Sequence, residues 1–167
     1  IQERARAAKF YELSAKQGHI PSQYNLALLL ENGLGVPTDM SKAAFWYRQA
    51  SDRGDINAQY ALGLMYEAGR GVSQSYEKAA SLYLAAAENG HVESQVNLGV
   101  VFVKGKSSLQ NYIQAHMWFN IAASQGNRAA RDYRDNIAKQ MVPQDISTAQ
   151  QLAQSCVLQN YIGCSRL

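Results

Sequence analysis

The sequence predicts an all-α protein, a solenoid built from antiparallel helix pairs that repeat along the chain. Three observations support this fold class: a fixed period, helical spacing of apolar residues within each period, and capping residues at the expected helix ends. The period is 36 residues and is set by two columns of glycine, Gly18, Gly54, Gly90 and Gly126 in the first and Gly33, Gly69 and Gly105 in the second. A period of about 20–50 residues is typical of a solenoid or a repeat array.

Each period contains two amphipathic helices. In the first segment the apolar positions follow the spacing i, i+3, i+4 and i+7, with Ala43, Trp46, Tyr47 and Ala50. The second segment repeats the spacing with Ala58, Ala61, Leu62 and Met65. This spacing places the residues of each set on one face of a helix, which is the face expected to be buried.

The residues between the helices agree with this division. One column holds Asp39, Ser75 and Asn111, whose side-chain oxygens can cap the free N–H groups at the start of a helix. The glycines Gly54, Gly90 and Gly126 follow the same helix, where a left-handed residue commonly ends it. Small residues inside the other helix, at Ala27, Gly63 and Gly99, indicate that a neighbouring helix approaches closely.

The motif A-Q-Y-x-L-G-x-M-Y-x-x-G-x-G-V, followed by K-A-A-x-x-Y-x-x-A-A-x-x-G, resembles the Sel-one-like repeat (SLR), a relative of the tetratricopeptide repeat. We expect one domain over residues 1–167, with a half repeat at 1–20, full repeats at 21–56, 57–92 and 93–128, and a divergent C-terminal cap at 129–167. The third repeat departs from the motif, because Ser107 and Ser108 replace Gly-Val. We expect its turn to be looser.

The resemblance implies a right-handed α-solenoid of about nine helices with a concave groove, in a bacterial protein. It also implies a non-catalytic scaffold that binds a protein or peptide in the groove without a cofactor. An alternative within the same families is an immunity-type inhibitor of a secreted bacterial effector. An enzyme and a purely structural spacer are further alternatives.

Composition and motifs argue against other classes of function. The chain has 16 Lys and Arg against 13 Asp and Glu, and no basic run of the kind that binds nucleic acid. No stretch approaches the roughly 20 apolar residues that cross a bilayer. The three histidines, His19, His91 and His116, form no metal-binding motif. No nucleophile has a recognisable base, and the repeated acids Glu31 and Glu67 are interpreted as structural or solvated positions.

Two cysteines, Cys156 and Cys164, lie in the tail. We favour a disulfide that fastens the cap and contributes about 2–3 kcal/mol, with two reduced thiols as the alternative. A disulfide predicts an oxidising compartment, and similar bacterial proteins are often periplasmic or exported. The interpretation is therefore a periplasmic or secreted protein, with the cytoplasm left open. The chain begins at Ile1 rather than Met, so we expect it to be processed or excised.

The predicted partner-binding residues are those where the repeats differ. Ile113, Met117 and Ile121 give one helix a second apolar stripe. Such a stripe indicates either an interface or a surface that the divergent tail buries. The corresponding face of the first repeat contains Phe45, Arg48 and Gln49, and an exposed aromatic residue there is a candidate anchor for a partner.

Overall fold

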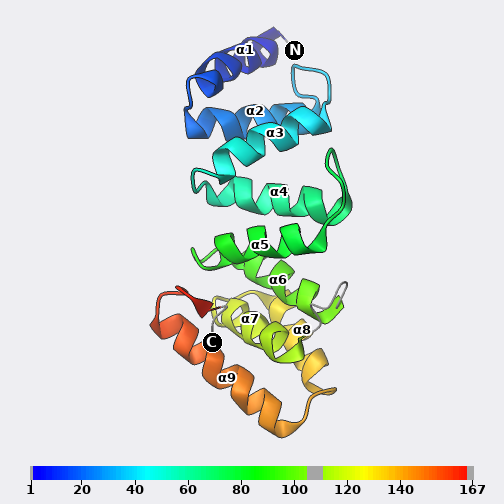
Figure 1. Ribbon diagram of the computed structural model, residues 1–167, viewed down its shortest axis with the longest axis vertical. Coiled ribbons are helices and arrows are strands. Elements are labelled where there is room, and N and C mark those ends of the chain that lie inside the picture. The colour runs from blue at the N-terminus through cyan, green and yellow to red at the C-terminus, as the bar shows by residue number, and fades with distance from the viewer. Residues whose placement is uncertain (1, 105–110, 165–167) are drawn as a thin grey trace. The chain divides into compact units, whose positions relative to one another are not determined.

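The computed structural model describes residues 2–104 and 111–164. Within these ranges the chain forms nine α-helices and no β-strand (Figure 1). The helix pairs follow the 36-residue period, which confirms the predicted all-α solenoid class. The chain divides into two compact units, unit 1 (Ile1–Leu82) and unit 2 (Tyr83–Leu167), which are described in turn. The predicted loose turn at Ser107 and Ser108 lies outside the described residues.

Unit 1 contains four complete helices and the start of a fifth. They are α1 (Gln2–Lys16), α2 (Ile20–Asn32), α3 (Met40–Ser51), α4 (Ile56–Ala68) and the first residues of α5 (Tyr76–Ala87). From α1 to α4, each helix packs against the next one along the chain. The predicted helix faces form the core, because Ala43, Tyr47 and Ala50 of α3 and Leu62 and Met65 of α4 are buried.

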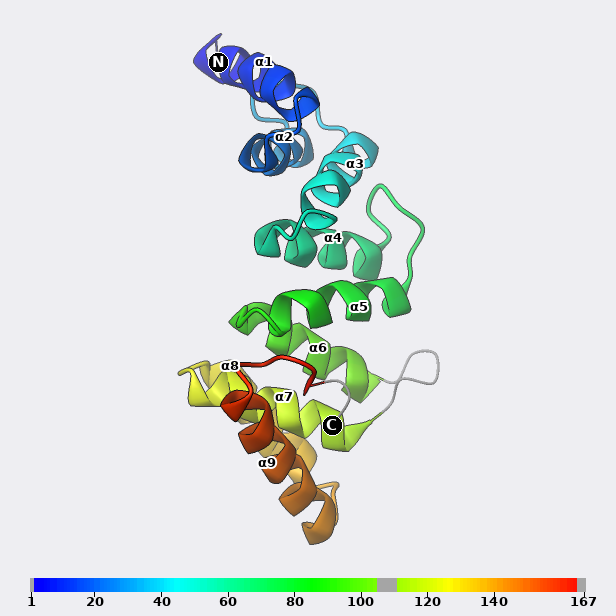
Figure 2. The same ribbon diagram turned by 60° about the vertical axis from the view of Figure 1, so that its left-hand side comes forward.

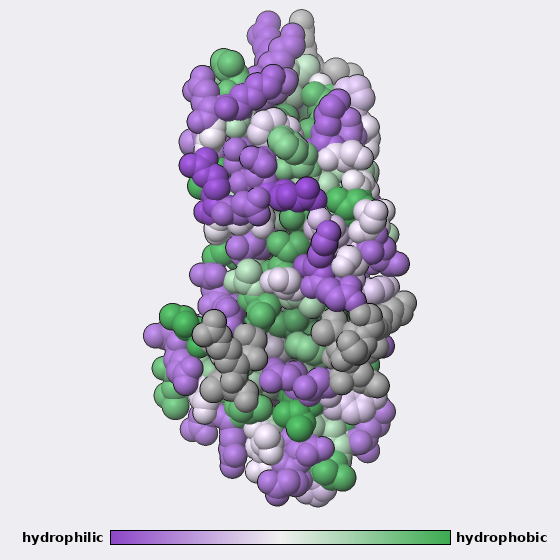
Figure 3. Space-filling view, viewed as in Figure 1, coloured by the Kyte–Doolittle hydropathy of each residue, from purple (hydrophilic) through white to green (hydrophobic). Residues whose placement is uncertain are grey.

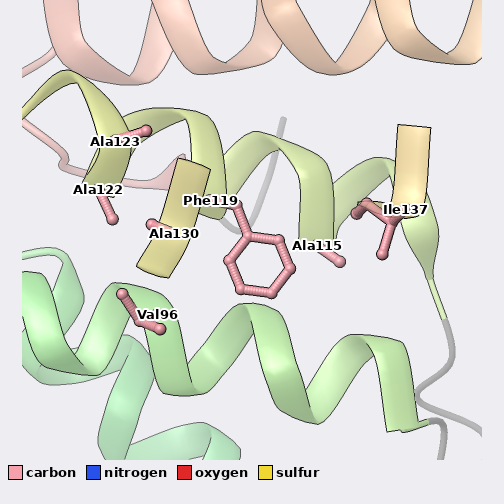
Figure 4. Close-up of a cluster of buried hydrophobic side chains, with 7 residues drawn as sticks. All are labelled: Val96, Ala115, Phe119, Ala122, Ala123, Ala130 and Ile137. Carbon is pink, nitrogen blue, oxygen red and sulfur yellow. The ribbon is translucent and has the colours of Figure 1, made fainter. Parts of the chain in front are cut away.

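Unit 2 begins within α5 and adds four helices: α6 (Val92–Lys104), α7 (Tyr112–Ser124), α8 (Arg128–Ala138) and α9 (Pro143–Leu158). Helix α7 is central, since it packs against α6, α8 and α9. The Phe119 ring of α7 lies over α6 in a cluster that includes Val96 of α6 and Ala130 and Ile137 of α8 (Figure 4). Burial of these apolar side chains stabilises the unit.

The predicted capping residues occupy their predicted positions. The side chains of Asp39, Ser75 and Asn111 accept hydrogen bonds from the backbone N–H groups three residues later, at 2.9, 3.3 and 3.0 Å. Each cap of this kind contributes about 1 kcal/mol to helix stability. The glycines after the same helices, Gly54, Gly90 and Gly126, have φ angles of 87°, 81° and 91°, as expected for a left-handed helix end.

Two glycines show why the repeat demands a residue without a side chain. A Cβ atom on Gly99 of α6 would collide with the Phe119 ring, which confirms close approach of a neighbouring helix at this position. A Cβ atom on Gly35 would collide with the backbone of α1 at Arg4 and Ala5. The second glycine of the Gly-x-Gly-Val turn is therefore explained by packing against a helix.

The C-terminal helix α9 lies against α7 (Figures 1 and 2). Immediately after α9 the chain turns back, and Cys156 forms a disulfide with Cys164 across a Cα–Cα distance of 5.2 Å. Both cysteines are buried. The disulfide confirms the favoured interpretation of the two cysteines and holds the segment after α9 against its last turn.

Candidate partner-binding surface

The outer face of α3 is the first part of the candidate surface. Because α3 turns Ala43, Tyr47 and Ala50 into the core, its opposite face meets solvent. Phe45 is 50% exposed, Arg48 is exposed and Gln49 is partly buried. The Phe45 ring packs edge-on against Trp46, with ring centroids 5.0 Å apart and an interplanar angle of 77°. This contact restricts the Phe45 side chain before any partner binds.

A cleft of about 420 Å³ adjoins this face between α1, α2 and α3. Its apolar part includes Ala8, Leu26, Leu30 and Trp46. Its rim carries both signs of charge, from Lys9, Glu12, Asp39 and Lys42. On the side of unit 1 seen in Figure 3, hydrophilic side chains predominate and hydrophobic ones are interspersed among them. A cleft with an apolar floor and a few polar groups at its edge is the usual form of a binding site.

Glu31 has a structural role beside this surface, as its repeated position predicts. Its carboxylate accepts a 2.8 Å hydrogen bond from the hydroxyl of buried Tyr47 and lies 3.2 Å from the Arg70 guanidinium. Burial, followed by the hydrogen bond to Glu31, raises the pKa of Tyr47 far above its ordinary value. The network joins α2, α3 and the turn after α4, and it fixes the helix that carries Phe45.

The corresponding stripe on α7 lies in a different environment. Met117 and Ile121 are 0% and 1% exposed, and Ile113 is partly buried. Helix α9 packs against α7, and a cavity of about 260 Å³ between them is lined by Ile121 together with Ala153 and Val157 of α9. Of the two interpretations of the stripe, the structure favours burial by the tail. A partner cannot reach Met117 or Ile121 while α9 is in place.

A third feature was not predicted from the sequence. Arg48 of α3 donates a 2.6 Å hydrogen bond to the Tyr66 hydroxyl of α4. The Lys78 ammonium of α5 lies 5.2 Å from the centroid of the same ring. These residues line a small cavity of about 200 Å³ together with Asp52 and Ser81. The sequence singles out Arg48 alone, because only the packing of three helices brings Tyr66 and Lys78 beside it.

The histidines at repeated positions contact serine side chains in the first turns of the helices that follow them. The Nδ1 atoms of His19 and His91 lie 2.8 and 2.9 Å from the hydroxyls of Ser22 and Ser94 at the starts of α2 and α6. Both histidines are therefore polar residues at the turns between helices. In the part of the chain that the structure describes, no group of three His, Cys, Asp or Glu side chains is placed to hold a metal ion. Among the described helices, none combines the length and apolar character needed to span a bilayer.

Comparison with protein families identifies the repeat. The family model described as Sel1 repeat matches residues 2–19, 20–55, 56–91 and 92–127, which together make up most of the chain. The chain belongs to the Sel1 repeat family. Sel1 repeat proteins generally mediate protein–protein interactions, and their fold is typically a non-enzymatic scaffold. The Sel1 repeats of this chain end at residue 127, so α8 and α9 lie beyond the matched segments.

Solved structures agree with the family assignment. A Sel1 repeat protein from Oxalobacter formigenes is 26% identical to this chain, with a TM-score of 0.76, and the match covers 79% of this chain and 54% of that one. The protein c5321, a protective antigen of uropathogenic Escherichia coli strains with an SLR fold, is 24% identical, with a TM-score of 0.68 and coverage of 96% and 43%. This chain thus spans about half the length of both. A comparison with curated proteins gave no match.

Proposed function

We propose that this Sel1 repeat chain is a non-catalytic scaffold that binds a protein or peptide through the outer face of α3 and the adjoining cleft of unit 1. The observation that carries the proposal is the exposed Phe45 ring, which is packed edge-on against Trp46 where Trp46 lines the cleft. A few residues carry most of the binding energy of an interface, and aromatic side chains that become buried in the complex are prominent among them.

The rest of the surface suits this role. Trp46 and the Glu31 network fix α3, so a partner meets a preformed surface and little side-chain entropy is lost on binding. Gln49 lies one helical turn after Phe45, and Arg48 lies beside it, so polar groups flank the aromatic anchor. Polar groups of this kind set the orientation of a partner and contribute less to its affinity.

The predicted residues of α7 are not included in the proposed surface. Met117 and Ile121 are covered, and they contribute to the stability of unit 2. Ile113 is partly buried at the start of the same helix. The proposed contacts are therefore Phe45, Arg48 and Gln49 together with the cleft residues, all within unit 1.

A capture experiment followed by measured affinities tests the proposal. The oxidised chain is used to recover proteins from its source organism, and the dissociation constant of a recovered partner is measured by calorimetry. Phe45→Ala should weaken binding by about 30-fold or more, the loss expected of a hot-spot residue. Tyr133→Ala is the matched control, because Tyr133 is an aromatic residue of similar exposure, 46%, on α8. Equal affinities of the Phe45 variant and the native chain would place the binding surface elsewhere.

We infer that the protein works in an oxidising compartment, the bacterial periplasm or the cell exterior. The Cys156–Cys164 disulfide supports this location, because reducing cytosols keep such thiols free. The test is the mass of the protein isolated from its source under thiol-blocking conditions. An intact disulfide leaves both cysteines unlabelled until a reductant is added, whereas labelling without reductant would contradict the inferred location.

A further inference from the structure

We propose that Arg48, Tyr66 and Lys78 form a carboxylate-binding site that receives an Asp or Glu side chain of the protein partner. The site lies wholly within unit 1, where α3, α4 and α5 meet, and this inference rests on the proposed function of unit 1. The inference specifies the chemistry of the partner, which is an acidic segment that binds over α3. The surface around Phe45 would hold the apolar part of that partner.

The geometry brings two cations to one aromatic ring. The Arg48 guanidinium carbon lies 5.9 Å from the centroid of the Tyr66 ring, and the Lys78 ammonium lies 5.2 Å from it. Tyr66 is only 8% exposed and, with buried Leu62, forms the apolar floor of a cavity of about 200 Å³. The charged ends of both side chains lie over this ring, and both residues are exposed.

Both cations retain capacity to bind an anion. Among the described residues, neither Arg48 nor Lys78 is within ion-pair distance of a carboxylate, and Arg48 makes one hydrogen bond, to the Tyr66 hydroxyl. A guanidinium has five N–H donors, so most of those of Arg48 remain available. A carboxylate matches the planar donor pair of arginine, and such charge-assisted contacts are stronger than contacts between neutral groups. The nearby Ser81 hydroxyl, which also lines the cavity, can donate to the same ligand.

The repeat itself does not require these charges. Within the matched repeats that follow, Leu84 and Asn120 occupy the position of Arg48, and Gln114 occupies the position of Lys78, so neither charge is common to the repeats. In unit 2 the neighbouring cation, Arg134, is paired with Asp135 at 2.8 Å. The unpaired cations of unit 1 are therefore not explained by folding of the repeat, and an acidic partner gives them a role.

Asp52 gives the proposal a further test, because its charge is opposite to that of Arg48 and Lys78. Its carboxylate lies at the same cavity and is exposed. For a ligand carboxylate, Asp52 is a repelling neighbour, so its neutralisation should strengthen binding while neutralisation of Arg48 or Lys78 weakens it. A site in which the three residues only stabilise one another would give no such opposite pattern.

The experiment uses the full oxidised chain and a defined probe. The probe is an acetylated and amidated alanine-based helical peptide with glutamates four residues apart, and its control is the same peptide with glutamine. Binding is followed by NMR through the Arg48 side-chain N–H and the backbone amides of Lys78 and Ser81. The glutamate peptide should shift these signals and the glutamine peptide should not. Arg48→Asn and Lys78→Gln should each weaken binding about fivefold, and Asp52→Asn should strengthen it about twofold.

The controls separate a site from a general effect of net charge. Lys16→Gln removes the same charge from α1, where Lys16 is paired with Glu12 at 2.7 Å, and it should change the affinity by less than about twofold. Equal binding of the two peptides, or an effect of Lys16→Gln as large as that of Lys78→Gln, would overturn the proposal. Tighter binding of inorganic phosphate or of the α-carboxylate of N-acetylalanine would assign the site to another anion and overturn it as well.

The outcome also separates this inference from the proposed function. If Phe45→Ala weakens a recovered partner while Arg48→Asn and Lys78→Gln do not, the carboxylate site fails and the scaffold function stands. If the Arg48 and Lys78 variants weaken the glutamate peptide while Phe45→Ala leaves the partner unaffected, the cations bind carboxylates but the surface around Phe45 is not the interface. Both results can be read from the same set of variants.

Discussion

The outer faces of α3 and α7 occupy the same place in the repeat but have opposite environments. Phe45 of α3 is 50% exposed, whereas Met117, at the same position of the repeat in α7, is 0% exposed. Gln49 is partly buried, whereas Ile121 at its equivalent position is 1% exposed. The difference follows from α9, which packs on α7. The same helix face of a repeat is therefore a surface in one copy and core in another, and its side chains differ accordingly.

Helix α9 achieves this by presenting the opposite face from that of a repeat helix. Its buried residues, Ala149, Ala153 and Cys156, lie at the repeat positions that face solvent in α3. Gln151 and Leu158 lie at the positions of buried Ala43 and Ala50, yet both are exposed. Because α9 lies beyond the segments that match the Sel1 repeat, its packing need not follow that of a repeat helix, and it turns small side chains onto α7. Small side chains also allow this close contact.

The largest expected difference between the two faces is in stability. Met117→Ala should lower the free energy of unfolding by about 2–5 kcal/mol, because it removes a fully buried side chain and leaves a cavity. Phe45→Ala should lower it by about 1 kcal/mol or less, since the ring is half exposed. Urea denaturation of the full chain measures both. A cost for Phe45→Ala as large as that for Met117→Ala would show that the face of α3 is also part of a core.

Removal of the disulfide tests whether the packing of α9 depends on it. The double variant Cys156→Ser, Cys164→Ser should lower the stability of unit 2 by about 2–3 kcal/mol, because the unfolded chain regains the freedom of a short loop. Trp118 is buried in unit 2 and Trp46 lies in unit 1, so fluorescence in a Trp46→Phe background follows unit 2 alone. The native chain treated with a reductant is the second measurement. If neither the double variant nor the reduced native chain loses stability, α9 is held by packing alone.

The repeat could be predicted from the sequence, and the environment of its surfaces could not. Glycine columns, helical spacing and capping side chains are local signals, and they correctly located the helices, Asp39, Asn111 and the buried face of α3. The disulfide was predictable because only two cysteines are present. Whether Ile113, Met117 and Ile121 were covered remained open, because α9 lies outside the repeat motif and its small buried residues give no strong signal. Arg48, Tyr66 and Lys78 meet only through the packing of three helices.

The two copies also differ in their response to pH. His116 of α7 is 2% exposed, whereas alanine, at Ala44 and Ala80, occupies this position in the two preceding repeats. Burial, and then the positive charge of Arg134, lowers the pKa of His116 below its ordinary value, and Asp135 partly offsets this. The Nδ1 atom has no hydrogen-bond partner in the described part of the chain. Protonation is therefore less favourable in the folded chain than in the unfolded chain.

The sign of the effect on stability follows from this difference. At a pH well above about 6.5 the histidine is neutral in both states and its contribution to stability is constant. Below that pH the unfolded chain takes up the proton first, so stability should fall by up to about 1.4 kcal/mol per pH unit. His116→Gln should flatten the dependence when unit 2 is followed by Trp118 fluorescence between pH 7 and pH 5. An unchanged slope in the variant would assign the pH dependence to other groups.

The smallest expected effect on stability is that of the charges in the cavity of unit 1. Replacement of Arg48 by Asn and Lys78 by Gln installs the residues that unit 2 has at the same repeat positions. The double variant loses the hydrogen bond to Tyr66 and two cation–π contacts, all of them made by the exposed side chains of Arg48 and Lys78. The free energy of unfolding should therefore change by no more than about 1 kcal/mol.

The control is Leu62→Ala, at the buried floor of the same cavity. It should lower the free energy of unfolding by about 2–5 kcal/mol, which shows that the assay responds to damage there. A loss of several kcal/mol in the double variant would mean that Arg48 and Lys78 serve the fold, and it would remove the reason to assign them to a partner.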